Sequence, residues 1–322
     1  MQANIITVIP VYNGARFLLR TLESVAAQTR RPDRLIVLDN CSTDATESIV
    51  RGFQGFPCEW IRNPTNLGLF GNMNRALEFA PQTRHLHLLC ADDLIAPRFF
   101  ETLVPPLESG DGFGLAFCLD ERIDENGEHL SLSGRVTGAV EAVRREDYLR
   151  QKGEIANQAL GGTIFKTNFQ PAPCQFRRDM PILADVVFYA EWGRHCQKIV
   201  KVHEALTQYR WHGTNTSCEL MPGLQPLVLD EWKTMELIAA LQGGMSFGRR
   251  CKLRGLFGVR SGIKARRIRQ LGNWKYSREI VAVGRRISGL PLWFAAQGVV
   301  HAREFIVYGL LRRRRQPQNV FG

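Results

Sequence analysis

The sequence predicts an α/β fold with a mostly parallel central sheet. Short apolar runs at residues 5–9, 35–38 and 86–89 alternate with segments of helical periodicity, as strands do when they are buried on both faces and joined by crossover helices. Two of these runs end in acids, Asp39 and the pair Asp92-Asp93. Ligands of open α/β sheets bind at the carboxyl ends of the strands, so these acids lie where a binding site is expected.

Periodicity and turn residues place the elements of the first hundred residues. Asp44 and Glu47 have the spacing of a capping box at the start of a helix. The expected elements are strands at 5–9, 35–38, 59–62 and 86–89, and helices at 18–29, 44–53 and 69–80.

The chain becomes less regular beyond Pro97. Two glycines, Gly161-Gly162, precede an apolar strand and permit a close approach of the backbone to a ligand, although a simple turn explains them equally well. The elements expected here are helices at 99–104 and 183–192, strands at 114–118, 163–165 and 199–202, and a polar loop from Asp120 to Gly138.

The adjacent carboxylates of Asp92 and Asp93 favour a divalent cation. Two such groups repel each other and are difficult to desolvate, and a cation relieves both effects. Oxygen ligands suit Mg²⁺ or Mn²⁺, which usually bridge to substrate phosphates. Asp39, at the end of a different strand, could hold the base or ribose of the same nucleotide. The alternatives are a solvated acidic turn at Asp92-Asp93 and a turn or cap aspartate at Asp39.

Five spaced motifs carry a resemblance to a known family. They are Val8–Gly14, Ser24–Thr29, Val37–Asp44, Asn66–Gly68 with Asn74, and Ala91–Asp93. Their order is similar to that in the family 2 glycosyltransferases. The resemblance covers roughly residues 3–218 and implies the GT-A fold and an inverting transfer of a sugar from a nucleoside diphosphate to a hydroxyl.

The resemblance also implies roles for particular residues. Asp185 matches the general base, and the metal ligands would be Asp92, Asp93 and His212. The residues expected to contact the donor nucleotide are Pro10, Tyr12, Asn13, Asp39, Asn66, Gly68, Asn74, Ala91, Asp92 and Arg210. One departure from the family is Cys90, which stands where many members have an aspartate. For Asp185 the alternative is a helix cap, and for His212 it is a structural histidine.

Charge divides the chain into two parts. Residues 245–322 carry a net charge of +16, and the residues before them carry −5. We therefore expect a catalytic domain over 1–222 and a basic, mainly helical region over 223–322. The apolar run 290–300, with Trp293 and Phe294, is too short to span a bilayer. Together with Phe305–Leu311 and the arginines at 312–315, it fits attachment to an anionic membrane surface.

The cysteines are scattered singly with no Cys-x-x-Cys pair, and no signal segment precedes the first strand, so we expect a cytoplasmic protein on the inner face of the cell membrane. We expect a metal-assisted glycosyltransferase that uses a UDP-, GDP- or dTDP-sugar and a lipid-linked or surface-polysaccharide acceptor. A sugar-nucleotide-binding membrane scaffold without turnover is the main alternative. Nucleic-acid binding rests on the basic tail alone, without a matching motif.

Overall fold

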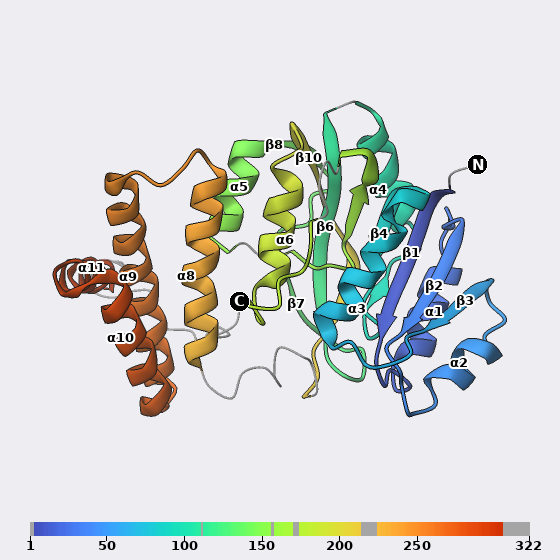
Figure 1. Cartoon of the computed structure of the whole chain (residues 1–322), viewed down its shortest axis with the longest axis horizontal. Helices are drawn as coiled ribbons and strands as arrows, with labels where there is room; N and C mark the ends of the chain where they lie inside the picture. The colour runs from blue at the N-terminus through green and yellow to red at the C-terminus, as the bar shows by residue number, and fades with distance from the viewer. Residues whose placement is uncertain (1–2, 111, 156–157, 170–173, 214–223, 305–322) are drawn as a thin grey trace. The chain divides into compact units, whose positions relative to one another are not determined.

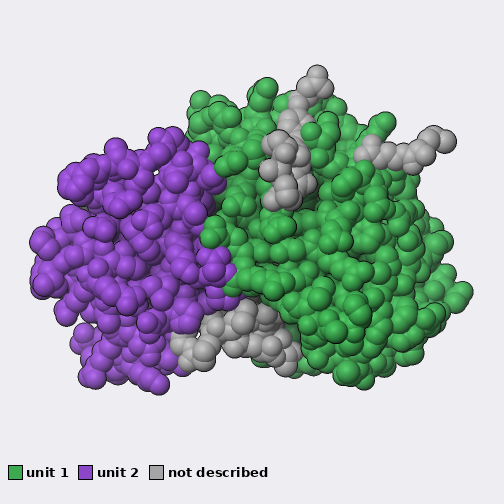
Figure 2. All heavy atoms as spheres, in the orientation of Figure 1, with its two compact units in different colours: residues 1–152, 156–178, 184–215 green, residues 153–155, 179–183, 216–322 purple. Residues whose placement is uncertain are grey.

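The structure is a computed structural model that describes residues 3–110, 112–155, 158–169, 174–213 and 224–304 (Figure 1). The described chain forms two compact units (Figure 2). Unit 1 is built from residues 1–152, 156–178 and 184–215, and unit 2 from residues 153–155, 179–183 and 216–322.

Unit 1 is organised around one mixed sheet. Its strands follow the order β3-β2-β1-β4-β9-β6-β10-β5, with β7 beside β6 and β8 beside β10. The strands are β1 (Ala3–Val11), β2 (Arg34–Asp39), β3 (Cys58–Arg62), β4 (Thr83–Leu88), β5 (Leu94–Ile95), β6 (Phe113–Ile123), β7 (His129–Leu132), β8 (Val140–Arg144), β9 (Thr163–Lys166) and β10 (Lys198–Arg210).

The direction of the strands brings several chain ends to one edge. β1 pairs in parallel with β2 and β4, and β2 pairs in parallel with β3. β9 is antiparallel to both β4 and β6, and β10 is parallel to β6. β6 and β10 therefore run in the same direction as β4. The carboxyl ends of β2, β4, β6 and β10 consequently lie along the same edge of the sheet, as the positions of Asp39 and Asp92 require.

Alternating side chains give the sheet two cores. In β2, Leu35 and Val37 pack in one core, whereas Ile36 and Leu38 pack in the other, because successive residues of a strand face opposite sides. Residues of α1, α2 and α4 complete the first core, and residues of α3, α5 and α6 complete the second (Figure 1). These helices are α1 (Leu18–Ala26), α2 (Thr46–Gly52), α3 (Leu69–Ala76), α4 (Phe99–Glu108), α5 (Arg145–Gly153) and α6 (Ala184–Gly193), with short 3-10 helices η1 (Leu77–Gln82) and η2 (Thr167–Phe169).

One detail of the expected secondary structure was wrong, and one expected strand is longer in the structure. The stretch from Asp120 to Gly138 is not simply a loop, since β6 extends to Ile123 and pairs with β7. Three of the four β7 residues are exposed, so no apolar alternation marks this strand. The strand expected at 199–202 belongs to the longer β10, whose register shifts between Val202 and Thr207 interrupt the alternation.

The predicted capping box is also wrong. The Asp44 carboxylate accepts from the N–H groups of Thr46 and Ala15, at 3.0 and 2.9 Å. Glu47 does not reach back to the start of the helix but pairs with Arg51 one turn later. Asp44 therefore connects the first turn of α2 to the loop after β1.

Unit 2 is helical in its described part. It contains α8 (Leu224–Leu241), α9 (Phe247–Gln270), α10 (Trp274–Ser288) and α11 (Leu290–Glu304). Apolar side chains of α8, α9 and α10 form a separate core that includes Val228, Phe257 and Ile280. None of the helices described here has the length and apolar character that crossing a bilayer would need.

The apolar face proposed around Trp293 needs correction. Trp293 is 2% exposed, and its ring lies so close to Gly284 that a Cβ there would be 2.2 Å from a ring carbon. Trp293 therefore packs inside unit 2, whereas Phe294 is 62% exposed. The apolar segment 305–311 and the arginines at 312–315 lie outside the described residues.

Candidate active site

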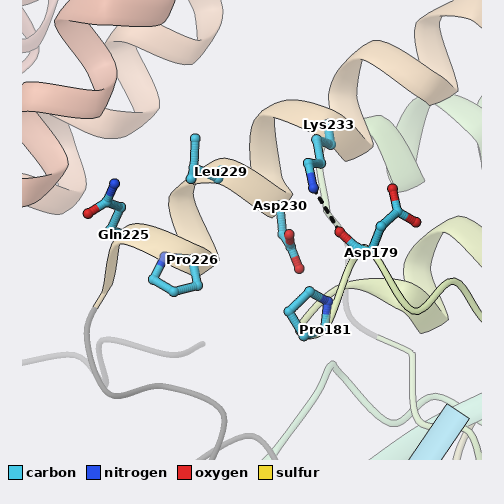
Figure 3. A pocket seen from close by; sticks show the side chains of 7 residues that line it. All are labelled: Asp179, Pro181, Gln225, Pro226, Leu229, Asp230 and Lys233. Atoms are coloured by element: carbon cyan, nitrogen blue, oxygen red, sulfur yellow. Dashed lines mark hydrogen bonds between the residues drawn. The ribbon is translucent and has the colours of Figure 1, made fainter.

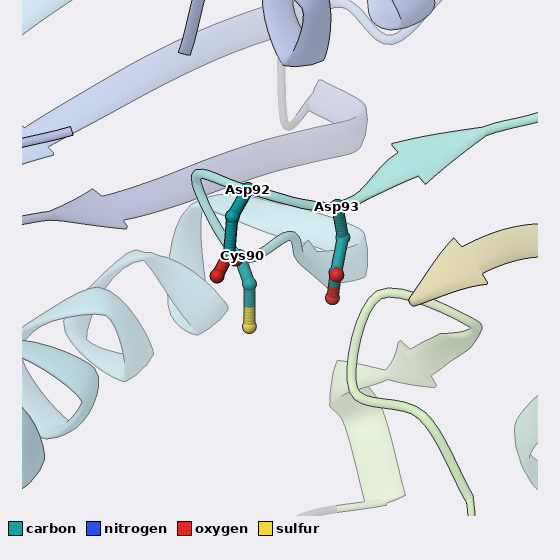
Figure 4. Close-up of side chains that lie close together, drawn as sticks. All are labelled: Cys90, Asp92 and Asp93. Carbon is teal, nitrogen blue, oxygen red and sulfur yellow. The ribbon is translucent and has the colours of Figure 1, made fainter. Parts of the chain in front are cut away.

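The loop after β4 gathers a thiol and two carboxylates. The Sγ of Cys90 and carboxylate oxygens of Asp92 and Asp93 all lie within 4.8 Å of one another. Figure 4 shows the three side chains pointing to the same side of the loop. The Asp93 N–H donates to the Cys90 carbonyl at 3.2 Å, and this tight turn brings the three groups together.

Burial makes this cluster electrostatically unfavourable without a cation. Asp93 is 2% exposed, and its burial, together with the neighbouring Asp92 carboxylate, raises the Asp93 pKa well above the usual range. Burial and the same acids also raise the pKa of the Cys90 thiol. A divalent cation would relieve the repulsion, so the donor set of Asp92 and Asp93 fits a hard metal ion, with Cys90 a softer third group.

His212 follows the end of β10 and lies beside the group of Cys90, Asp92 and Asp93, called the acid cluster below. The Nε2 of His212 lies 3.0 Å from the Oδ2 of Asp92, and the imidazole packs against the Phe17 ring at a centroid distance of 4.9 Å. His212 is 8% exposed. The structure thus brings His212 to Asp92, which itself lies beside Asp93.

Arg210 acts as a clamp, in the sense that it donates hydrogen bonds to both Asp92 and Asp93. Its Nε donates to the Asp92 carbonyl at 3.0 Å and its Nη1 to the Asp124 carbonyl at 3.1 Å. Its backbone N–H donates to Asp93 Oδ1 at 2.9 Å. We expected the guanidinium to contact the donor. It is buried, and it donates to backbone carbonyls, one of which belongs to the loop of residues 90–93, called the metal loop below.

Asp39 is fully buried and already paired. Its Oδ1 accepts from the Ser42 N–H at 2.9 Å, and its Oδ2 accepts from Arg62 Nη1 at 2.8 Å. Arg62 also donates to the Ser42 carbonyl. The sequence analysis missed Arg62, although β3 pairs with β2 so that Arg62 lies opposite Asp39.

The loops after β1 and β2 are joined by hydrogen bonds. The Asn13 N–H donates to Ser42 Oγ, and Asn13 Oδ1 accepts from the Thr43 N–H, both at 2.9 Å. Asn13 has a φ of 51°, a left-handed conformation that asparagine tolerates better than most residues. Pro10 is buried within β1, and the neighbouring Tyr12 is 51% exposed. Tyr12 is therefore available to a ligand.

The asparagines expected at the donor divide into two groups. Asn66 Oδ1 accepts from Asn40 Nδ2 and from the Gly68 N–H, both at 2.8 Å, and Gly68 has a φ of 74°. Asn74 instead forms two hydrogen bonds with the backbone of Phe176, at 3.0 and 2.7 Å. In this structure the Asn74 amide holds the chain segment at Phe176.

Asp185 is the second residue of α6, and its charge acts on the cluster of Cys90, Asp92 and Asp93. Its Oδ1 accepts from the Val186 N–H at 2.8 Å. Burial raises the Asp185 pKa, and the Val186 N–H and the Lys152 ammonium act in the opposite direction. The Asp185 charge is close enough to help raise the pKa of Cys90. The structure therefore brings the expected base to the same region as the expected metal ligands.

Gly161 and Ala91 belong to the wall of the same region. A Cβ at Gly161 would lie 2.9 Å from a Leu89 side-chain carbon and 3.8 Å from Asp93 Oδ2. The glycine thus permits the loop before β9 to approach Asp93. The Ala91 carbonyl accepts from Thr21 Oγ1 at 3.0 Å, which ties the metal loop to α1.

A separate pocket lies in unit 2 and contains none of the expected site residues (Figure 3). Its volume is about 310 Å³, and Lys233 Nζ donates to the Asp179 carbonyl at its side. The lining residues are Asp179, Pro181, Gln225, Pro226, Leu229, Asp230 and Lys233. We base the candidate active site on the acid cluster, where the chemical groups converge.

The sequence of unit 1 is similar to that of known glycosyltransferases. Residues 6–159 match the model of glycosyl transferase family 2. An uncharacterized glycosyltransferase from Nostoc is 27% identical over 229 residues, which cover 65% of each chain. The succinoglycan biosynthesis protein ExoO of Rhizobium meliloti is 30% identical over 128 residues, 40% of this chain and 34% of that protein. These matches span less than two thirds of the relatives' lengths.

Solved structures share the fold at low identity. S. aureus TarS in complex with UDP-GlcNAc has a TM-score of 0.56 and 15% identity, covering 88% of this chain and 90% of that one. The mannosyltransferase PcManGT from Pyrobaculum calidifontis, in complex with GDP-Man and Mn²⁺, has a TM-score of 0.52 and 14% identity, covering 95% and 81%. Both likenesses extend well beyond the segment that matches the family model.

Proposed function

We propose, from the match of residues 6–159 to glycosyl transferase family 2 and from the GT-A fold, that this chain is a glycosyltransferase that transfers a sugar, with inversion, from a nucleoside diphosphate to an acceptor hydroxyl. The observation that carries the proposal is the convergence of Asp92, Asp93 and His212 beyond the carboxyl ends of β4 and β10, and the charge of Asp185, at the start of α6, acts on the neighbouring Cys90 thiol. A donor diphosphate and these carboxylates would repel each other, so the proposal includes a bound Mg²⁺ or Mn²⁺.

Asp92 is the proposed first ligand of that ion, because its carboxylate is partly exposed and lies beside both Asp93 and His212. When bound, the ion would supply positive charge to the diphosphate leaving group. Mn²⁺ is present in the complex of PcManGT, which supports a divalent ion of this kind. Arg210 would act by keeping the backbone of the metal loop in place.

Asp185 is the proposed general base. An inverting displacement needs one carboxylate to accept the proton of the attacking hydroxyl. The Asp185 carboxylate accepts a hydrogen bond from the Val186 N–H in the first turn of α6. Asp39, Asn13, Asn66 and their loops would form the nucleotide side of the site.

The donor and acceptor classes rest on the relatives' names. UDP-GlcNAc is bound in TarS and GDP-Man in PcManGT, so we propose a UDP-, GDP- or dTDP-linked sugar as the donor. ExoO is named for succinoglycan biosynthesis, which supports a glycan or glycolipid acceptor. Transfer to a lipid-linked or surface-polysaccharide acceptor would place the enzyme at the inner face of the cell membrane.

Peripheral attachment through unit 2 is part of this proposal. Its exposed apolar side chains include Phe247 at 86%, Leu271 at 58% and Trp274 at 51% exposure, and its helices are rich in arginine and lysine. Basic helices with exposed aromatic residues bind anionic membrane surfaces. Retention on anionic vesicles at low salt would support this placement, and no binding at low salt would contradict it.

A donor screen with an acceptor mixture tests the enzymatic proposal. Wild-type protein with Mn²⁺ should release a nucleoside diphosphate from one sugar nucleotide in the panel, and Asp185→Asn should lower transfer by at least about a hundredfold with little change in donor affinity. The matched control is Glu146→Gln, an exposed acid on α5, which should retain full activity. Donor binding without turnover in the wild type would instead favour the scaffold.

A further inference from the structure

A second pocket of unit 2 lies where α9 turns into α10. Its volume is about 350 Å³, and it is lined by Arg266, Arg269, Gln270 and Trp274. The first three residues stand at positions i, i+3 and i+4 of α9, which places them on one face of the helix. None of these four described residues is acidic, so the pocket gathers two guanidinium groups and an amide without a carboxylate.

The turn between the helices brings Trp274 back beside the end of α9. The Gly272 N–H donates to the Arg269 carbonyl at 3.0 Å, and the Asn273 N–H donates to the Ile268 carbonyl at 3.1 Å. Gly272 has a φ of 82°, the left-handed conformation that commonly ends a helix with this pair of hydrogen bonds. α10 therefore begins at Trp274, next to the last turn of α9.

Contacts with rings orient both guanidinium groups. The Arg269 guanidinium lies over the Trp274 indole, 4.1 Å from the ring centroid, and Arg266 Nη2 donates to His301 Nε2 on α11. The indole attracts the Arg269 cation without neutralising it, and among the described residues Arg269 forms no ion pair. Trp274 is 51% exposed and Arg269 is also exposed. A ligand from solution can therefore reach this charge.

The surroundings of the pocket are strongly basic. Residues 247–304, which span α9, α10 and α11, contain 14 arginines and lysines and two glutamates, Glu279 and Glu304. Cations in such excess repel one another, and an anion that binds among them relieves the repulsion. The charge therefore favours an anionic ligand in the pocket over a neutral sugar or a cation.

A phosphoryl group fits the lining better than a carboxylate does. One guanidinium can pair with both oxygens of a carboxylate in a plane, whereas a phosphate monoester presents three acceptor oxygens in different directions. Arg266 and Arg269, one turn apart, and the Gln270 amide provide donors for such a group. The indole of Trp274 and the neighbouring Leu271, which is 58% exposed, add apolar surface beside these donors.

We propose that this pocket is a binding site for a phosphate monoester. Both lipid headgroups and small soluble phosphates carry that group. The inference does not depend on sugar transfer, and it goes beyond the peripheral attachment proposed above, because it assigns recognition to four residues rather than to the total charge of the helices. The exposed indole and Leu271 favour the lipid as the source, since an aromatic ring beside basic residues suits the membrane interface.

Vesicle sedimentation of the full chain tests the site. Phosphatidylcholine vesicles would contain either phosphatidic acid, a monoester, or phosphatidylglycerol, a diester, at the same surface potential and in about 0.15 M salt, where charges are screened beyond about 8 Å. The wild type should bind the phosphatidic acid vesicles several-fold more tightly, because the monoester offers one more acceptor oxygen. Arg269→Gln should weaken that binding at least about tenfold, as expected for one lost charge-assisted hydrogen bond.

Two further variants separate the pocket from the total charge. Arg250→Gln removes the same charge from an exposed position of α9 that does not line the pocket, so it should keep the preference for the monoester. Trp274→Leu should weaken binding about two- to fivefold, which corresponds to an exposed cation–π contact. Arg269, Arg250 and Trp274 are all exposed, so the three variants should unfold at the wild-type temperature.

Calorimetry in solution identifies the source of the phosphate. The probes are inorganic phosphate and a short-chain, water-soluble phosphatidic acid. Tighter binding of the lipid, lost in Arg269→Gln, would support a headgroup site, and equal binding of both probes, lost in the same variant, would support a site for soluble phosphates. Phosphate binding by a wild type that ignores all vesicles would retain the pocket and reject membrane attachment.

The proposal would be overturned by equal binding to the two kinds of vesicle, with Arg269→Gln and Arg250→Gln weakening it to the same extent. Total charge alone would then account for attachment. Absence of binding to vesicles and to both soluble probes would overturn the pocket and the attachment together. Neither result would bear on the proposed sugar transfer, which the donor screen tests separately.

Discussion

Arg210 offers the sharpest test of how the metal loop is held. Replacing it with methionine keeps an unbranched apolar side chain and removes the hydrogen bonds to the carbonyls of Asp92 and Asp124. The backbone N–H that donates to Asp93 remains in the variant. The perturbation therefore addresses the guanidinium alone.

The magnitude follows from two charge-assisted hydrogen bonds of ordinary length, at 3.0 and 3.1 Å. Each contributes about 1.5–3 kcal/mol, and the contact of the guanidinium with Phe17, at 4.9 Å, adds about 1 kcal/mol. The variant regains the cost of burying a charge, which is large enough that burial lowers the Arg210 pKa. We expect Arg210→Met to lose about 2–4 kcal/mol of unfolding free energy, the usual range for breaking a buried polar network.

Urea unfolding of wild type and variant measures this loss. The matched control is Arg16→Met, because Arg16 also stacks on Phe17, at 4.8 Å, but its side chain is 59% exposed. That control should change the unfolding free energy by less than about 1 kcal/mol. Unchanged stability of Arg210→Met, together with a donor affinity reduced more than about tenfold, would refute the clamp and assign Arg210 to the diphosphate, as the family resemblance implies.

Three further predictions concern the groups around the loop. Asp92→Asn should fold normally but lose Mn²⁺-dependent donor binding in calorimetry, and undiminished binding would move the metal away from Asp92. Cys90→Asp should tighten Mn²⁺ binding, because its carboxylate would join a cluster whose ligand atoms lie within 4.8 Å; an unchanged Mn²⁺ affinity would mean that position 90 does not reach the ion. His87 is buried, and burial lowers its pKa to about 4. Its unfolded form binds a proton near pH 6.5, so between pH 7 and pH 4 the wild type should lose about 3 kcal/mol more unfolding free energy than His87→Gln, and equal losses in urea titrations would contradict this.

The sequence predicted the parts of the site that follow strand ends. The apolar runs before Asp39 and Asp92 mark buried strands, and the acids after them mark the carboxyl edge. Spaced motifs carried the family resemblance, and several of them, such as Val37–Asp44 and Ala91–Asp93, lie where strands end at that edge. These signals are local, and local signals are what a single sequence carries best.

The pairing of distant residues was not predictable in the same way. The position of β9 between β4 and β6 depends on the packing of the whole sheet. Arg62 is opposite Asp39 only because β3 pairs with β2 in that register. Lys152 lies in a segment of mixed charge whose periodicity gives no sign of burial. The aromatic rings around its ammonium are those of Phe117, Tyr148 and Tyr189, which come from β6, α5 and α6.

The partners of the four site acids explain why a cation is expected at one of them in particular. Asp39 is bonded to Arg62, Asp92 to His212, and Asp185 is coupled to Lys152. Asp93 differs from these residues, since burial and its neighbour Asp92 raise its pKa far more than the Arg210 backbone lowers it. A metal ion would stabilise the Asp92-Asp93 pair, because its charge would balance two adjacent carboxylates of which Asp93 is buried. The fold therefore holds two adjacent carboxylates in an arrangement that favours the binding of a cation near the proposed base.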